Sequence, residues 1–169
     1  MPPRITKGRP QKTNAVRLLE SKGLPFELLE YPVDESDLSA ERAASLLGLP
    51  EAAVYKTLVA LGDRTGHVKA LIPAGRQLSL KALADATGDK KILMLHVRDL
   101  LEVTGYVRGG CSPLGGKLRC PVYILDEALA LERMAFNAGR RGLLAYMKPG
   151  DFLLAAGAVP APISPPGEG

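Results

Sequence analysis

The sequence predicts an α+β domain in which a mixed, barrel-like curled β-sheet carries peripheral helices. Strand-like apolar segments and amphipathic helical segments follow one another in an irregular order, unlike the steady alternation of a parallel α/β fold. In the last third of the chain, short apolar segments alternate with glycine clusters, which is typical of curved strands. The length of 169 residues fits one domain, and 46% hydrophobic and 24% charged content is ordinary for a globular protein.

The helices are predicted from their ends. Thr13 and Ser39 each precede an amphipathic stretch and can cap it through a side-chain oxygen, and a glycine ends each of the first four helices. Pro149 suits the first turn of the last one. The expected helices are residues 13–22, 39–47, 79–87, 97–103 and 149–156.

The strands are predicted from short apolar runs bounded by turn residues. A glycine-containing turn, residues 62–66, joins two of them into a hairpin. The expected strands are residues 26–31, 54–61, 67–72, 92–95, 122–125, 133–137 and 142–146.

Both ends of the chain differ in composition from the middle. Residues 1–12 hold three prolines and four basic side chains, and residues 159–169 hold four prolines. We therefore expect a basic flexible tail, one folded domain over residues 13–158, and a Pro/Gly-rich flexible tail. Removing the four basic residues of the first tail from the total of 22 leaves 18, which equals the 18 acidic residues. That tail either contacts a phosphate backbone or only keeps the protein soluble.

Composition also argues against several classes of protein. The apolar runs are far shorter than the roughly 20 residues of a membrane-spanning helix, and the N-terminus lacks the apolar stretch of a secretory signal. We expect a cytoplasmic protein without membrane contact, in which Cys111 and Cys120 are free thiols rather than a disulfide. His67 and His96 have no second ligand at metal-binding spacing, and no cofactor-binding motif occurs, so neither a metal nor a cofactor is expected.

The segment of residues 105–116 is the most unusual one, with five glycines in twelve positions. Successive amide N–H groups in such a loop can converge on an anion or on the oxyanion of an ester-hydrolysis intermediate. A flexible surface loop is the alternative interpretation.

Two basic segments are further candidates. Lys56 shares one face of its strand with Val54 and Leu58, where an ammonium group needs an anionic partner unless it reaches water at the rim of the sheet. Residues 137–142 are polar, basic and glycine-rich, and they either hold a phosphate or an RNA 3′ end or simply form a turn.

No protein nucleophile stands out. The chain has no GxSxG motif, and no pair of carboxylates suggests acid–base chemistry. Cys111 lies near Arg108 and is a candidate thiolate, but no general base can be assigned to it.

Three segments, taken together, resemble the YbaK/EbsC and prolyl-tRNA synthetase editing-domain family in order and spacing. They are the strand Val54-Tyr55-Lys56-Thr57-Leu58, a G-x-x-x-P loop over residues 109–113, and residues 139–143. The resemblance covers roughly residues 14–156. It implies a mixed sheet curled around a small pocket, and hydrolysis of the ester that joins a mischarged amino acid to the terminal adenosine of tRNA.

The resemblance also implies roles for individual residues. Lys56 would contact the terminal nucleotide or the carbonyl region, and backbone amides of residues 109–112 would bind the ester. The implied catalytic residues are Lys56, Gly110, Cys111 and Ser112, and the implied substrate-binding residues are Tyr31, Gly109, Pro113, Asn137 and Gly139. Family members lack a protein nucleophile, and substrate groups are thought to assist the reaction.

Three positions depart from the family pattern. Asn137 stands where many relatives carry serine, Leu144 where some carry an acid, and Cys111 where an apolar residue is usual. The amino acid preferred by relatives therefore cannot be transferred to this chain.

We expect a trans-editing hydrolase that deacylates Cys-tRNA(Pro), with Ala-tRNA(Pro) as the second candidate, by oxyanion stabilisation and substrate-assisted ester hydrolysis. Mischarged tRNA is the expected partner, prolyl-tRNA synthetase is a candidate partner, and DNA is not expected. One alternative is a non-catalytic RNA- or nucleotide-binding module with the same fold. Another is a cysteine hydrolase centred on Cys111.

Overall fold

The computed structural model describes the backbone of residues 4–6 and all of residues 12–166. In this part, the helices are α1 (Asn14–Ser21), α2 (Ala40–Leu47), α3 (Leu80–Thr87), α4 (Leu100–Thr104) and α5 (Pro149–Ala156), with 3-10 turns η1 (Glu51–Ala53), η2 (Val97–Asp99) and η3 (Asp126–Ala130). The strands are β1 (Arg4–Thr6), β2 (Glu27–Glu30), β3 (Val54–Gly62), β4 (Gly66–Pro73), β5 (Ile92–Met94), β6 (Val122–Leu125), β7 (Met134–Arg140), β8 (Leu143–Met147) and β9 (Val159–Ala161). Every expected helix and strand is present, although the helix expected over residues 97–103 begins as the 3-10 turn η2. No helix of the described part is long and apolar enough to cross a bilayer.

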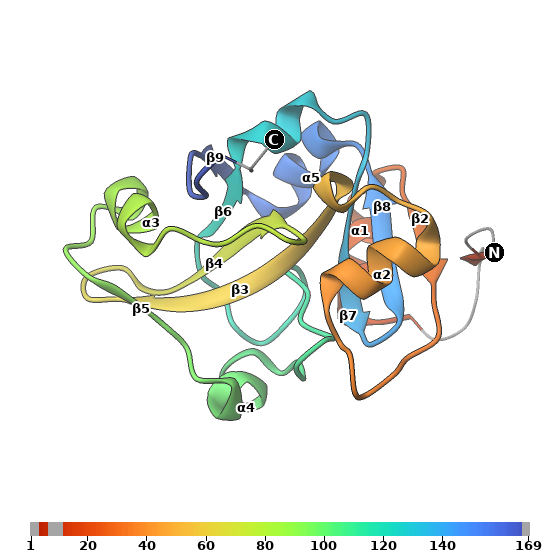
Figure 1. Ribbon diagram of the computed structural model, residues 1–169, viewed down its shortest axis with the longest axis horizontal. Helices are drawn as coiled ribbons and strands as arrows, with labels where there is room; N and C mark the ends of the chain where they lie inside the picture. The colour runs from red at the N-terminus through yellow and green to blue at the C-terminus, as the bar shows by residue number, and fades with distance from the viewer. Residues whose placement is uncertain (1–3, 7–11, 167–169) are drawn as a thin grey trace.

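The strands form one mixed sheet in the order β1-β2-β8-β7-β3-β4-β6-β9, and β5 pairs with the far end of β3. The pairs β3–β7, β4–β6 and β6–β9 are parallel, and the other pairs are antiparallel. Strand β3, drawn in yellow, runs through the middle of the molecule (Figure 1). The expected hairpin of β3 and β4 is confirmed, with Gly62 opposite Gly66. The predicted α+β class with a mixed sheet is therefore confirmed.

The helix boundaries follow from local capping chemistry. The hydroxyl oxygens of Thr13, Ser39 and Ser79 accept hydrogen bonds from the backbone N–H three residues later, at 3.1, 3.2 and 3.1 Å. Helices α2, α3 and α4 end at glycines in the left-handed conformation. These residues fix where each helix begins and ends before any tertiary contact is made.

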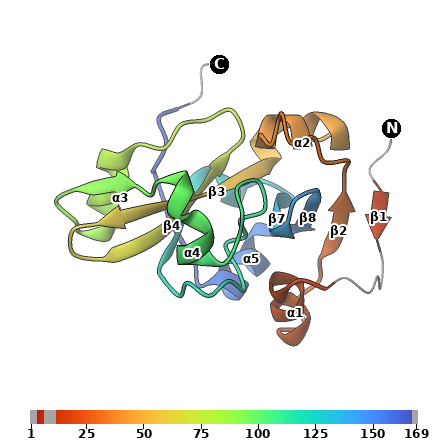
Figure 2. The same cartoon turned by 90° about the horizontal axis from the view of Figure 1, so that it is seen from below.

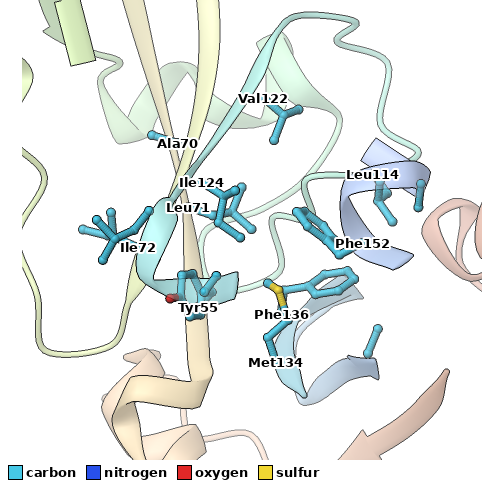
Figure 3. Close-up of a cluster of buried hydrophobic side chains, with 14 of the residues drawn as sticks. Tyr55, Ala70, Leu71, Ile72, Leu114, Val122, Ile124, Met134, Phe136 and Phe152 are labelled. Carbon is cyan, nitrogen blue, oxygen red and sulfur yellow. The ribbon is translucent and has the colours of Figure 1, made fainter. Parts of the chain in front are cut away.

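Side chains of the central strands build two cores on opposite faces of the sheet. Tyr55 and Phe136 belong to the larger core, which includes α1 and α5, and the rings of Phe136 and Phe152 lie 4.8 Å apart (Figure 3). The preceding residues of the same strands, Val54 and Ala135, pack beneath α2 instead. Because neighbours along a strand point to opposite faces, Val54 and Ala135 face α2 while Tyr55 and Phe136 face the larger core.

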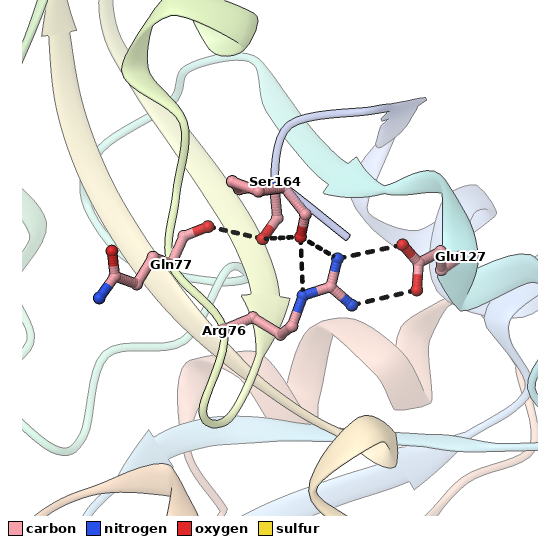
Figure 4. A network of polar contacts seen from close by, with 5 residues as sticks. Arg76, Gln77, Glu127 and Ser164 are labelled. Carbon is pink, nitrogen blue, oxygen red and sulfur yellow. Dashed lines mark hydrogen bonds and ion pairs between the residues drawn. The ribbon is translucent and has the colours of Figure 1, made fainter. Parts of the chain in front are cut away.

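The C-terminal segment is part of the fold, which corrects the expectation of a flexible tail over residues 159–169. Strand β9 pairs with β6, and Ile163 is fully buried. The guanidinium of Arg76 donates two hydrogen bonds to the carbonyl oxygen of Pro165, at 3.1 and 2.6 Å, and forms a two-point ion pair with Glu127 (Figure 4). The prolines of this segment suggested a loose tail, but an edge strand tolerates proline because one of its sides needs no N–H donors.

Part of the N-terminal tail is also a strand. Residues 4–6 form β1, which pairs with β2 at the edge of the sheet, whereas composition predicted a flexible tail over residues 1–12. A three-residue edge strand needs only backbone hydrogen bonds, so composition is a poor guide to it. Residues 1–3, 7–11 and 167–169 lie outside the described residues, and the expectation that this basic tail contacts phosphates falls largely on them.

Candidate active site

A cavity of about 460 Å³ lies beside α2, at a place where β3 has no neighbouring strand on one side. Pairing between β3 and β7 stops at Tyr55, and pairing between β3 and β5 starts at Ala60. Residues 56–59, between these two points, line the cavity. A break in the sheet therefore gives a ligand access to the middle of its central strand.

Two walls and the glycine-rich loop, residues 105–116, enclose this space. The loop wall consists of the segment of residues 36–41 that leads into α2, and the second wall consists of Met94, Leu95, Val97 and Leu100 from β5, η2 and α4. The glycine-rich loop contributes Arg108, Gly109 and Cys111. The cavity is thus bounded by segments that lie far apart in the sequence.

Five of the nine residues singled out from the sequence line the cavity, and four do not. Those in the lining are Tyr31, Lys56, Gly109, Cys111 and Asn137. Gly110, Ser112, Pro113 and Gly139 lie outside the lining, and Ser112 is fully buried. The fold brings Tyr31 of the loop after β2, Lys56 of β3 and Asn137 of β7 to one cavity.

Lys56 and Thr57 present polar groups that no neighbour uses. Lys56 is half-buried and forms no ion pair within the described residues. The hydroxyl of Thr57 is buried and has no hydrogen-bond partner in this part of the chain. A buried polar group without a partner costs about 1–3 kcal/mol, which a ligand that bonded to it would offset. Both residues are therefore available to a molecule in the cavity.

The glycine-rich loop is an ordered structure. The Gly110 N–H donates to the carbonyl oxygen of Val107 at 2.9 Å, and the hydroxyl of Tyr106 donates to that of Leu114 at 2.6 Å. The Leu114 N–H in turn donates to the hydroxyl oxygen of Ser112 at 3.1 Å. These bonds hold the loop in one shape, which favours a binding loop over a loose surface loop.

This network changes which amides the loop can offer to a ligand. The Gly110 N–H is used within the loop, whereas the N–H groups of Gly109, Cys111 and Ser112 donate no hydrogen bond within the described residues. Close packing explains the glycine at position 110 instead, because a Cβ atom there would lie 3.1 Å from the backbone nitrogen of Arg141. Within residues 109–112, the free donors are therefore these three amides.

The turn between β7 and β8 clamps the glycine-rich loop to the sheet. The side-chain amide of Asn137 donates to the carbonyl oxygens of Gly109 at 3.0 Å and Arg140 at 3.1 Å. Its oxygen accepts from two backbone N–H groups of the bulge in β7, at 2.6 and 3.2 Å. Arg141 Nε donates to the carbonyl oxygen of Arg108 at 2.8 Å. The segment that the sequence left open as a phosphate site or a simple turn thus supports the loop.

Lys69 of β4 is a candidate that sequence reasoning missed. Its side chain is buried, it forms no ion pair within the described residues, and its ammonium group donates to the carbonyl oxygen of Pro113 at 3.4 Å. A buried cation with so few partners is costly, and here it lies behind the glycine-rich loop. The available signal was a lysine inside an apolar strand, the same signal that drew attention to Lys56.

The two cysteines are free thiols. Burial raises the pKa of Cys111 and of Cys120 above the ordinary value, and the positive charge of Lys69 opposes this only in part. Cys111 therefore keeps its proton at neutral pH, which makes it a poor nucleophile. The described residues also contain no cluster of three His, Cys, Asp or Glu side chains that could hold a metal ion.

Residues 34–154 match the sequence model of the aminoacyl-tRNA editing domain. The chain belongs to the aminoacyl-tRNA editing family. The matched range contains Lys56, the glycine-rich loop and the clamp around Asn137, and Tyr31 precedes it. The family resemblance found in the sequence is thereby confirmed.

Relatives of this editing family differ in how much of the chain they share. EbsC of Enterococcus faecalis, named provisionally as a Cys-tRNA(Pro)/Cys-tRNA(Cys) deacylase, is 44% identical over 143 residues, which are 85% of this chain and 87% of the relative. A proline–tRNA ligase of Thermosipho africanus is 34% identical over 77 residues, which are 46% of this chain but only 14% of the ligase. Somewhat less than half of this chain therefore has a counterpart within a much larger protein.

Solved structures show that the fold is shared at low identity. A provisionally assigned trans-editing enzyme for prolyl-tRNA synthetase superposes with a TM-score of 0.80 at 24% identity, over 93% of this chain and 100% of that structure. The hypothetical protein APE2540 superposes with a TM-score of 0.82 at 24% identity, over 90% and 99% of the two chains. At this identity the likeness concerns the fold alone.

Proposed function

We propose that this protein is a trans-editing hydrolase that deacylates mischarged tRNA, with Cys-tRNA(Pro) as its substrate and Ala-tRNA(Pro) as the second candidate. The observation that carries the proposal is the cavity itself, which is lined both by Lys56, without an ion pair in the described residues, and by a loop with free backbone amides. The relative from E. faecalis matches most of this chain, and its name as a Cys-tRNA(Pro)/Cys-tRNA(Cys) deacylase supports the choice of amino acid and tRNA.

The proposed reaction uses water as the nucleophile. Water attacks the carbonyl carbon of the aminoacyl ester, and the carbonyl oxygen becomes an oxyanion that the amides of Gly109 and Cys111, both in the cavity lining, stabilise. The bond to the ribose oxygen then breaks, and that oxygen takes up a proton as the amino acid leaves. One oxyanion donor is typically worth about 2.7–4 kcal/mol of activation free energy. An aminoacyl ester is already activated, so these donors and a positioned water suffice.

Lys56 and Thr57 have binding roles in this scheme. Lys56 binds the phosphate of the terminal nucleotide or the carbonyl region of the ester, because a half-buried ammonium group gains most from an anionic partner. The buried hydroxyl of Thr57, which has no partner in the described residues, gains a hydrogen-bond partner when substrate is bound. Substrate hydroxyl groups position the water, as the family resemblance implies.

The small cavity also suggests how the substrate is selected. A synthetase pocket separates amino acids that differ by one methylene by only about 1–3 kcal/mol, so a second pocket is needed for accuracy. Met94, Leu95, Val97 and Leu100 give the cavity an apolar wall that suits a small amino acid such as cysteine or alanine. In this scheme the cavity is the second pocket, which accepts the wrong amino acid for hydrolysis.

A panel of labelled mischarged tRNAs tests the proposal directly. The full-length chain should release cysteine from Cys-tRNA(Pro) well above the uncatalysed rate. Lys56→Ala should lose most of this activity with unchanged thermal unfolding, because the lysine serves the substrate rather than the core. Lys148→Ala removes an exposed lysine outside the cavity and should behave as the wild type.

Three outcomes would contradict the proposal. Binding of tRNA without hydrolysis of any ester would indicate the non-catalytic RNA-binding module. Retained activity in Lys56→Ala would exclude the assigned role of the lysine. Release only in the presence of prolyl-tRNA synthetase would contradict an independent enzyme and would make the synthetase an obligatory partner.

A further inference from the structure

The two walls of the cavity carry different charges. Residues 30–41, which contain the loop wall, include five carboxylates and no lysine or arginine. Residues 90–108, which contain the second wall, include four lysines or arginines and two carboxylates. Asp34, Glu35 and Asp37 on the acidic side are all exposed. Arg140 and Arg141 pair with Glu30 and Glu35, and Arg42 lies close enough to lower the pKa of Asp34 and Asp37, so part of this acidic charge is offset. The loop side still attracts a polyanion less than the β5 side does.

Three cations gather at the far end of β5. The backbone N–H groups of Lys90 and Lys91 donate to the carboxylate of Asp63 at 3.0 and 3.2 Å, and the Arg64 N–H donates to Asp89 at 2.7 Å. These bonds hold the loop before β5 against the turn between β3 and β4. The side chains of Arg64, Lys90 and Lys91, here named the basic tip, are exposed and form no ion pair within the described residues.

An exposed apolar surface joins the basic tip to the cavity. Leu93, Met94 and Val97, here named the apolar shelf, are 56%, 42% and 60% exposed. Met94 and Val97 also line the cavity. Lys91 and Met94 are three residues apart on an extended chain, or about 10 Å at 3.3 Å per residue. The exposed apolar side chains therefore lie along the chain between the cavity, which Met94 and Val97 line, and the cations of the basic tip.

We propose that the single-stranded end of the tRNA leaves the cavity over the β5 wall. Its unpaired bases rest on the apolar shelf, and phosphates further along the acceptor arm contact the basic tip. Bases present apolar faces and phosphates carry the charge, so this order of surfaces matches a single strand that emerges from a pocket. The inference rests on the proposed function, because it assumes that the terminal adenosine occupies the cavity.

A charge-reversed double variant tests the path. Lys90→Glu/Lys91→Glu is compared with Arg17→Glu/Lys22→Glu, which changes the net charge equally in the middle of α1 and at its C-cap. Both views place α1 and α3, which precedes the basic tip, at opposite ends of the molecule (Figures 1 and 2). Each protein is assayed on full-length Cys-tRNA(Pro), on the cysteinyl ester of adenosine, and for binding of uncharged tRNA at several salt concentrations.

The basic-tip variant should lose about tenfold or more in kcat/KM on tRNA and keep its activity on the adenosine ester. The slope of log affinity against log salt should fall by about 2, one for each lost phosphate contact. The α1 variant should match the wild type in every assay. Equal losses in both variants, or no loss in the basic-tip variant, would overturn the path.

A second variant examines the apolar shelf, and the binding assay separates the two proposals. Leu93→Ser/Val97→Ser should weaken tRNA binding without changing the salt slope, because stacking is lost and charge is kept. Unchanged affinity would overturn the proposed contact with bases. If the wild type hydrolyses neither substrate, the proposed function fails, and the salt slopes still decide whether tRNA follows this path.

Discussion

Replacing Asn137 by aspartate exchanges one heavy atom of the clamp, the amide nitrogen, for oxygen and changes almost nothing of its shape. The side-chain oxygen can still accept from the two N–H groups of the β7 bulge. The amide nitrogen, however, becomes an oxygen that faces the carbonyl oxygens of Gly109 and Arg140 at about the present 3.0 and 3.1 Å. Two attractive contacts thereby become two repulsive ones.

The size of the effect follows from these four bonds. A hydrogen bond contributes about 0.5–1.5 kcal/mol net, so removing all four in Asn137→Ala costs about 2–6 kcal/mol, toward the lower end because the half-buried site admits water. Asn137→Asp keeps two of the bonds but leaves two carbonyl groups opposed by an acceptor. We expect the aspartate variant to be destabilised at least as much as the alanine variant, despite its closer shape.

Urea denaturation of the three proteins at pH 7, with m-values compared, measures this order. Deacylation of Cys-tRNA(Pro) should fall in both variants, because Gly109 loses its tether to the sheet. An aspartate variant within about 0.5 kcal/mol of the wild type, with normal turnover, would refute the clamp, since surface changes without a structural role usually lie in that range.

Three further predictions concern the titratable side chains of Cys111, Asp89 and Lys69. Cys111→Ser should keep substantial activity, because burial keeps the thiol protonated and its backbone amide does the work; activity near the uncatalysed rate would favour a cysteine hydrolase. The Thr87 hydroxyl and two backbone N–H groups hold the pKa of Asp89 below its ordinary value, so this carboxylate stabilises the fold at neutral pH and loses its effect as pH falls through about 4 and below. Asp89→Asn should accordingly show a smaller loss of stability between pH 7 and pH 3 than the wild type, and equal losses would exclude this role. Lys69→Met should lower kcat on Cys-tRNA(Pro) with little change in KM and with partial rescue in Lys69→Arg, because the ammonium group positions the loop; an unchanged kcat would contradict this.

Local chemistry in the sequence explains most of the fold. The caps at Thr13 and Ser39 need only neighbouring backbone groups, so residue order alone predicts them. Strands β1 and β9 were missed for the opposite reason. Each is a short edge strand formed by backbone pairing with a strand distant in the sequence, and proline content is a weak guide to such pairing.

The residues of the candidate site also fall into those that the sequence predicted and those that only the fold revealed. Lys56 and the glycine-rich loop are visible as unusual residues in their own segments. The bond between Asn137 and Gly109 joins residues 28 apart, and the bond between Lys69 and Pro113 joins residues 44 apart. No local pattern encodes such partners, because they depend on which strands the sheet places side by side. The sequence therefore indicated which segments form the site, and the fold showed which residues support them.

Strand β9 has a consequence for the behaviour of the protein in solution. Without it, β6 would be the last strand of the sheet and would expose unpaired N–H and C=O groups to other molecules, which is how sheets join edge to edge and aggregate. With it, the outermost strand is three residues long and has Pro160, which has no N–H to donate, at its centre. The hydrogen bonds of Arg76 to Pro165 hold the segment that follows β9 in place. A C-terminal truncation that removed it would lower solubility before it touched the chemistry of the cavity.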